Sequence, residues 1–155
     1  MTGTGSYSAP LDRHALAAII PHRPPFLLVD EIVELDPGVS ARGIWRIGGD
    51  EWFLAGHFPG NPIVPGVMMV ESAAQVAAVC ALTHPDQQGK FGVFAAIDGV
   101  RFTRIVRPGD ELSIEIAVDR LRGRLGRVRA EVSVAGERAV QGMLTFGLLD
   151  EPAAA

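Results

Sequence analysis

One histidine of this sequence lies in a segment whose backbone is restricted by proline and glycine. Residues 56–66, GHFPGNPIVPG, contain three prolines and three glycines, which predicts a fixed, non-repeating loop. Histidine titrates near neutrality, so the imidazole of His57 can accept a proton at physiological pH. Most loop histidines only form hydrogen bonds, and His14, His22 and His84 compete with His57. His57 therefore needs a second reactive group to support a catalytic role.

That second group is Glu71, the only acidic or basic side chain between Pro65 and Leu82. Burying a lone carboxylate is costly, so such a group pairs with a cation or keeps its proton. An apolar environment favours the protonated form, which makes Glu71 a candidate general acid. The alternative is a carboxylate near a helix N-terminus that compensates the helix dipole.

Two neighbours of Glu71 are candidates for the same site. Gln75 follows it by four residues, on the same helix face, and either orients the acid or only satisfies its hydrogen bonds. Gly66 opens the helix, so its backbone N–H is an unpaired donor that a substrate carbonyl oxygen could accept. A base, an acid and such a donor suit removal of a proton next to a carbonyl and β-elimination of water.

Arginine is concentrated in residues 101–129, which hold eight Arg against four acidic residues, although the whole chain has a net charge of −4. This stretch would attract phosphopantetheine and an acidic carrier protein, and we predict Arg101, Arg104 and Arg107 as docking residues. The alternative is that these side chains are solvated on strand faces. Overall acidity and the lack of a stacking aromatic pattern argue against nucleic-acid binding.

Cysteine content and hydropathy exclude several classes of protein. Cys80 is the single cysteine, so neither an internal disulfide nor a cysteine-based metal site is expected. No apolar run reaches the ~18 residues needed to cross a bilayer, and the first residues do not resemble a signal peptide. We predict a cytoplasmic protein that contacts no membrane and holds no metal.

The candidate residues require a helix and a sheet to position them. Residues 65–82 favour a long helix that is apolar nearly all round and must therefore be enclosed. A shorter helix is expected over residues 10–20. Strand-like runs separated by turns predict an early hairpin and a later four-stranded meander; they cover residues 26–35, 39–47, 93–102, 111–121, 127–135 and 138–148.

These elements predict one α+β domain over residues 10–149, with an antiparallel sheet curved around a central helix. The length of 155 residues leaves little room for a second domain. Residues 1–9 and 150–155 are expected to form a flexible leader and tail.

Three motifs give the chain a strong resemblance to the 3-hydroxyacyl-[acyl-carrier-protein] dehydratases of FabZ type. They are PHRPPFLLVD over 21–30, GHFPGNPIVPGVMMVESAAQ over 56–75, and AIDGVRF with VRPGD over 96–110. The resemblance covers roughly residues 15–148 in the expected order. It implies the hot-dog fold and dimers, often arranged as trimers of dimers.

The resemblance also implies a reaction: dehydration of (3R)-3-hydroxyacyl thioesters on acyl carrier protein to trans-2-enoyl thioesters, in fatty-acid or polyketide biosynthesis. No cofactor is implied beyond the carrier's phosphopantetheine. By motif position His57 is the base, and Glu71 is the acid that reaches the site from the neighbouring subunit. We expect Gly66 and the Phe58 backbone to polarise the thioester carbonyl. The expected substrate-binding residues are Gly66, Phe58, Gln75, Ile63, Val64 and Phe94.

Two other functions remain open on the sequence alone. A hot-dog thioesterase would use a helix carboxylate to direct water at the thioester, but such proteins generally lack the histidine loop. A non-catalytic acyl-binding subunit, paired with an active paralogue in a mixed dimer, is the second alternative. The presence of both His57 and Glu71 argues against it. Glutamate at position 71 also resembles the dehydratase branch that does not isomerise its product.

Overall fold

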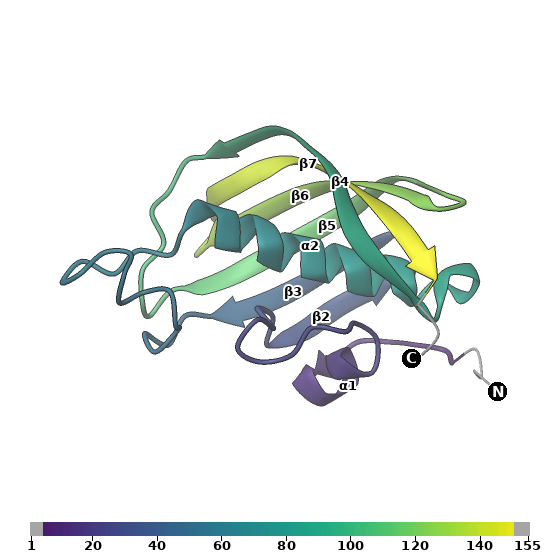
Figure 1. The fold of residues 1–155 in the computed structure, drawn as a ribbon, viewed down its shortest axis with the longest axis horizontal. Helices are drawn as coiled ribbons and strands as arrows, with labels where there is room; N and C mark the ends of the chain where they lie inside the picture. Colours follow the sequence, from purple (N-terminus) through teal and green to yellow (C-terminus); the bar gives the residue numbers. More distant parts are fainter. Residues whose placement is uncertain (1–4, 151–155) are drawn as a thin grey trace.

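A computed structural model describes residues 5–150 of the chain (Figure 1). One antiparallel sheet of seven strands curves around the long helix α2 (Gly66–Leu82). The remaining helices, α1 (Arg13–Ala17) and the 3-10 helix η1 (Pro85–Gln87), are short. In sheet order the strands are β1 (Leu11–Asp12), β2 (Glu31–Asp36), β3 (Ser40–Arg46), β5 (Glu111–Arg122), β6 (Leu125–Val134), β7 (Glu137–Asp150) and β4 (Lys90–Phe102).

Helix α2 is the centre of the core, as its apolar composition predicts. Twelve of its residues are buried, and the helix lies against the concave face of the sheet (Figure 1). The sheet approaches the helix closely at Gly43 of β3, where an added Cβ would lie 2.6 Å from a methyl carbon of Val76. A side chain at this position would push the sheet away from the helix.

Strands β5 and β6 bury one face each, as their alternating pattern predicts. Leu112, Ile114 and Ile116 are buried and alternate with more exposed neighbours in β5. In β6, Val128 and Val132 are buried in the same way, and Val132 lies opposite Ile114 in the ladder. The predicted α+β fold with a curved sheet around one helix is therefore confirmed.

The predicted order of the late strands is wrong in one respect. Strands β5, β6 and β7 form a meander, but β4 pairs with β7, at the far edge of the sheet, and not with β5. Alternation of apolar residues shows which face of a strand is buried but not which strand is its neighbour. The second edge of β4 has no strand beside it within residues 5–150.

The N-terminal elements differ from the prediction in their bounds. The helix expected over 10–20 is shortened, because Leu11 and Asp12 pair with β2 and the Asp12 side chain caps α1 by accepting from Ala15 N–H at 2.9 Å. The strand expected from residue 26 begins at Glu31, after a loop that contains the Pro24-Pro25 pair.

The predicted leader and tail lie partly outside the described residues, namely at 1–4 and 151–155. Residues 5–9 contact the domain: the Gln88 side chain donates to the carbonyl oxygen of Gly5 at 2.9 Å. Strand β7 continues through Asp150. Within residues 5–150 no helix is long and apolar enough to cross a membrane.

Candidate active site

The loop that carries His57 lies between β3 and α2, at one end of the molecule (left in Figure 1). Its backbone is cross-linked by hydrogen bonds. His57 N–H donates to Leu54 O at 3.1 Å, and Ile63 N–H donates to His57 O at 2.8 Å. Phe58 and Asn61 exchange two backbone bonds, at 2.9 and 2.8 Å. The loop therefore has the fixed, non-repeating course that its prolines and glycines predict.

The His57 imidazole is held in one orientation by this loop. Its Nδ1 lies 2.8 Å from the carbonyl oxygen of Ile63. A carbonyl oxygen can only accept, so we assign the hydrogen of the neutral ring to Nδ1 and the lone pair to Nε2. The ring also stacks on Phe58, with centroids 4.1 Å apart. Nε2 is thus the atom of His57 that can take a proton.

Glu71 lies in the second turn of α2, with 20% of its side chain exposed. Its Oε1 accepts a hydrogen bond from Gln75 Nε2 at 3.0 Å. Gln75 is completely buried, and it also donates to Phe26 O and accepts from Leu28 N–H, both at 2.8 Å. Of the two roles open on the sequence, the structure supports orientation of the acid. The direct substrate contact predicted for Gln75 stays a prediction, and its side chain is completely buried in the single chain.

A small pocket of about 60 Å³ opens beside Glu71. Its walls come from α2, β4 and β7 and are mostly apolar. Phe94 lines this pocket, and its predicted contact with an acyl chain stays a prediction. His57 is not among the lining residues, which are His22, Glu71, Ala74, Ala78, Gly92, Val93, Phe94 and Phe146. The single chain therefore does not bring the predicted base and acid together in this pocket.

Gly66 is the first residue of α2, and its backbone N–H has no hydrogen-bond partner within residues 5–150. The ring of Phe102 packs against it so closely that an added Cβ would lie 2.6 Å from a ring carbon. The Phe58 N–H, expected to assist Gly66, already donates to Asn61 O. The contribution of the Phe58 backbone stays a prediction, and Gly66 offers a backbone N–H without a partner among the described residues.

Ile63 and Val64 connect the histidine loop to the rest of the domain. Both backbone groups of Ile63 bind His57, and Val64 N–H donates to Val106 O at 2.9 Å. The Val64 side chain belongs to the hydrophobic core, whereas Ile63 is half-buried. Their predicted contact with the acyl chain stays a prediction.

The three predicted docking arginines differ in their surroundings. Arg104 is paired with Asp110 at 3.1 Å and with Glu137 at 3.0 Å, and these partners raise the pKa of its guanidinium. Its charge is thus largely neutralised by the domain itself. Arg107 is exposed and donates to the Asn61 side chain of the histidine loop at 2.7 Å. Arg101 is exposed near the end of β4 and forms no ion pair within residues 5–150.

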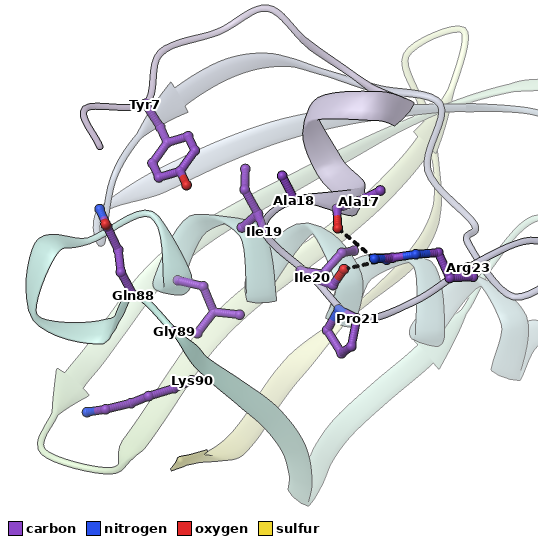
Figure 2. A pocket seen from close by; sticks show the side chains of 11 residues that line it. Tyr7, Ala17, Ala18, Ile19, Ile20, Pro21, Arg23, Gln88, Gly89 and Lys90 are labelled. Carbon is purple, nitrogen blue, oxygen red and sulfur yellow. Dashed lines mark hydrogen bonds between the residues drawn. The ribbon is translucent and has the colours of Figure 1, made fainter. Parts of the chain in front are cut away.

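A second hollow, of about 180 Å³, lies between residues 17–23 and 88–90 (Figure 2). Neither His57 nor Glu71 lines it. The Arg23 guanidinium in its wall donates to Ala17 O and Ile20 O, both at 2.9 Å, as the dashed lines show. Gln88 in the same wall bonds to Thr83 O.

In residues 5–150 no group of three His, Cys, Asp or Glu side chains could hold a metal ion.

Sequence reasoning missed one member of the site. His22 was considered only as a competitor of His57, yet its Nε2 lies 3.4 Å from Oε1 of Glu71 and its ring lines the same pocket. Its position in the PHRPPF motif was the available signal. The contact could not be predicted from spacing, because it depends on the course of the loop before β2.

The family model of the FabA-like domain matches residues 20–143 of the chain. The 3-hydroxyacyl-[acyl-carrier-protein] dehydratase FabZ of Chloroflexus aggregans is 50% identical over 135 residues, which are 87% of this chain and 94% of that protein. The protein of the same name from Thermomicrobium roseum is 48% identical over 144 residues, covering 93% of this chain and 97% of the relative.

Among solved structures, the dehydratase heterocomplex ApeI:P from Xenorhabdus doucetiae contains a similar chain. The TM-score is 0.75 at 18% sequence identity, over 88% of this chain and 91% of that one. At this level of identity the similarity shows a common fold.

Proposed function

This chain belongs to the FabA-like domain family and, within it, to the FabZ-type dehydratases, and from this membership we propose that His57 and Glu71 are its base and its acid. The chain is a lyase that removes water from 3-hydroxyacyl thioesters on acyl carrier protein, in fatty-acid biosynthesis. The observation that best supports the assignment of the base is the hydrogen bond from His57 Nδ1 to Ile63 O, because it leaves Nε2 free to accept a proton.

In the first half of the reaction, His57 Nε2 takes the proton from C2 of the (3R)-3-hydroxyacyl group. The Ile63 carbonyl, 2.8 Å from Nδ1, stabilises the imidazolium that forms. The electron pair of the broken C2–H bond moves toward the thioester carbonyl, whose oxygen accepts a hydrogen bond from Gly66 N–H. A donor at a helix N-terminus suits this developing negative charge.

In the second half, the C3–oxygen bond breaks and Glu71 gives its proton to the departing hydroxyl, which leaves as water. The electron pair from C2 completes the double bond of a trans-2-enoyl thioester. Gln75 supports this role, because its amide fixes the Glu71 carboxyl from behind. The chemistry uses two side chains and a backbone N–H, so it needs no cofactor beyond the phosphopantetheine that carries the substrate.

We propose that base and acid meet across a homodimer. His57 is absent from the walls of the pocket beside Glu71, which supports the supply of the base by a second copy. The free edge of β4 supports this arrangement, because the strand is 13 residues long and exposes Val93, Phe94 and Ile97. Long exposed apolar edges pair readily with another chain. Dimers arranged as trimers, or a mixed dimer with a paralogue, are compatible with the same edge.

Acyl carrier protein is the proposed partner, and its acidic surface would meet Arg101 and Arg107. Both side chains are exposed, and Arg107 bonds to the histidine loop through Asn61. A carrier bound there would deliver its phosphopantetheine close to His57. Arg104 is less available, because Asp110 and Glu137 already neutralise it.

A product analysis tests the proposed reaction. Purified protein is incubated with 3-hydroxybutyryl and longer 3-hydroxyacyl groups on acyl carrier protein, and mass spectrometry follows the loss of one water. We expect enoyl products, and the variants His57→Ala and Glu71→Gln should each lose most of the activity. Release of free carrier thiol would instead identify a thioesterase. Activity that appears only after a second subunit is added would identify a mixed dimer.

A further inference from the structure

A second histidine touches the proposed acid. Nε2 of His22 lies 3.4 Å from Oε1 of Glu71, the same oxygen that accepts from Gln75. We propose that His22 is a positioning residue: it holds Oε1 together with Gln75, so that Oε2 presents the transferable proton to the substrate. This inference rests on the proposed function, in which Glu71 is the general acid.

The orientation of the Gln75 amide decides which Glu71 oxygen is the acceptor. Leu28 N–H donates to Oε1 of Gln75, and Phe26 O accepts from its Nε2, both at 2.8 Å. These two backbone groups determine the orientation of the amide. A flipped amide would place its NH2 group against the Leu28 N–H and its oxygen against the Phe26 carbonyl oxygen, and neither pair can form a hydrogen bond. Gln75 therefore presents an N–H to Oε1 of Glu71, at 3.0 Å.

The surroundings of His22 favour a donor at its Nε2. Its Nδ1 is the one buried side-chain nitrogen or oxygen without a hydrogen-bond partner in residues 5–150. A buried N–H without an acceptor is rarer in proteins than an unused acceptor. The ring hydrogen is therefore best placed on Nε2, which faces Glu71. Because Gln75 donates to Oε1 and Nε2 of His22 lies 3.4 Å from the same oxygen, we place the acidic proton on Oε2.

The backbone around His22 is fixed by its neighbour Arg23. The Arg23 guanidinium donates to the carbonyl oxygens of Ala17, Ile20 and His22, at 2.9, 2.9 and 2.8 Å. Figure 2 shows the first two of these bonds. The loop before β2 thus holds the imidazole against α2 in a defined place, which a positioning role requires.

The chemistry explains why a second donor is useful. When Glu71 gives up its proton, a carboxylate remains in a pocket whose other walls, from α2, β4 and β7, carry no ionisable side chain. The donors from His22 and Gln75 stabilise that charge. The 3.4 Å separation is longer than an ordinary hydrogen bond. It shortens as the carboxylate forms, because catalytic contacts tighten in the reacting complex.

Replacement of His22 tests the inference and distinguishes a positioning role toward Glu71 from a merely structural role. His22→Leu removes the donor, whereas His22→Gln keeps an N–H that can reach the place of Nε2. With carrier-bound 3-hydroxyacyl substrate, we expect His22→Leu to lower kcat about tenfold to a hundredfold, with KM changed less than about threefold. His22→Gln should recover most of kcat.

Two controls make each outcome decisive. His14→Leu, at a histidine of α1 that does not line the Glu71 pocket, should behave as wild type. In a Glu71→Gln background, His22→Leu should cause no further loss, because the acid through which it acts is gone. If Glu71→Gln is inactive but His22→Leu retains wild-type kcat, this inference fails while the proposed function stands. If Glu71→Gln is fully active, the proposed function itself fails. Equal losses in His22→Leu and His22→Gln would also overturn the inference.

Discussion

The side chain of His57 and the carbonyl oxygen of Ile63 are joined by a contact of 2.8 Å that closes the histidine loop on itself. The backbone repeats this link in the opposite sense, since Ile63 N–H donates to His57 O, also at 2.8 Å. The loop thereby sets both the position of the ring and its tautomer. A base prepared in this way needs no third side chain to orient it.

The first prediction concerns the tautomer of His57. In the neutral ring the hydrogen should reside on Nδ1, because Ile63 O offers an acceptor there. Long-range proton–nitrogen correlation spectra of protein labelled with ¹⁵N-histidine would show this directly. The signals are assigned by comparison with His57→Asn. A hydrogen found on Nε2 would remove the proposed base from the mechanism.

The second prediction concerns the assembly of the site from two chains. His57→Ala and Glu71→Gln are each expected to be nearly inactive, yet a refolded equimolar mixture should recover activity. Half of the randomly formed dimers are mixed, and one of their two sites contains both intact residues, so about one quarter of wild-type activity is expected.

The matched control is a mixture of His57→Ala with the double variant His57→Ala, Glu71→Gln, which cannot form an intact site. Size-exclusion chromatography and a subunit-exchange assay verify that mixed dimers form. An inactive mixture in which exchange is complete would show that base and acid belong to one chain.

The sequence predicts well which side chains of a strand are buried, because successive side chains of a strand point to opposite faces of the sheet. Ile114 and Val132 are buried as alternation requires, and they lie opposite one another in the ladder. The place of β4 next to β7 could not be predicted in this way. Strand order depends on how the connections cross the sheet, and the alternation of apolar residues gives no information about those connections.

In the candidate site, too, contacts within one segment can be predicted from the sequence, whereas contacts between distant segments cannot. The rigid course of the His57 loop follows from its own prolines and glycines, and the Gln75–Glu71 bond follows from helical spacing. The contact of His22 with Glu71 joins two segments far apart in the chain. It depends on the loop before β2, whose conformation is set by tertiary hydrogen bonds.

The third prediction tests the close packing at the N-terminus of α2. In Gly66→Ala the new Cβ would lie 2.6 Å from a ring carbon of Phe102, so the ring has to move. Phe102 is about half exposed, and the cost in stability should be only about 1 kcal/mol. The proposed carbonyl site loses its shape, and kcat/KM should fall by more than about tenfold.

Phe102→Ala provides the reference for this effect, because it removes the ring without touching Gly66. The double variant Gly66→Ala, Phe102→Ala should then lose less activity relative to Phe102→Ala than Gly66→Ala loses relative to wild type. Wild-type kcat/KM in Gly66→Ala would contradict the expectation that the carbonyl site depends on the close packing of Phe102 against residue 66.

The fourth prediction concerns docking of the carrier protein. Arg101 and Arg122 are both exposed and unpaired within residues 5–150, but Arg101 is near the end of β4 and Arg122 near the turn between β5 and β6 (Figure 1). Arg101→Glu should raise KM for carrier-bound substrate about threefold to tenfold at low ionic strength. The increase should shrink in high salt, because the attraction is screened. Arg122→Glu is the matched control.

A short thioester that lacks the carrier protein separates docking from chemistry. With this substrate Arg101→Glu should react as wild type does. Equal effects of Arg101→Glu and Arg122→Glu would show that only net charge matters and that the docking surface lies elsewhere.

The fifth prediction uses Cys80, which is fully buried in α2. Burial raises the pKa of its thiol from 9.0 to about 11. Below pH about 8 the thiol is mostly protonated in both the native and the unfolded chain, so it gives little pH dependence. Between pH about 9 and 11 the unfolded chain releases this proton and the native protein keeps it. The free energy of unfolding should therefore fall as pH rises, by up to about 3 kcal/mol from this group.

Other groups titrate in the same range, so the test is a difference between two proteins. Cys80→Ala is less stable at pH 8 because it leaves a cavity in the core, but it lacks the thiol. Urea unfolding at pH 8, 9.5 and 10.5 should show the stability gap between wild type and Cys80→Ala narrowing as pH rises. The thiol should also resist alkylation in the native protein and react after unfolding, because the thiolate is the nucleophile. A gap that stays constant to pH 10.5 would mean that the native protein allows Cys80 to ionise as freely as the unfolded chain does.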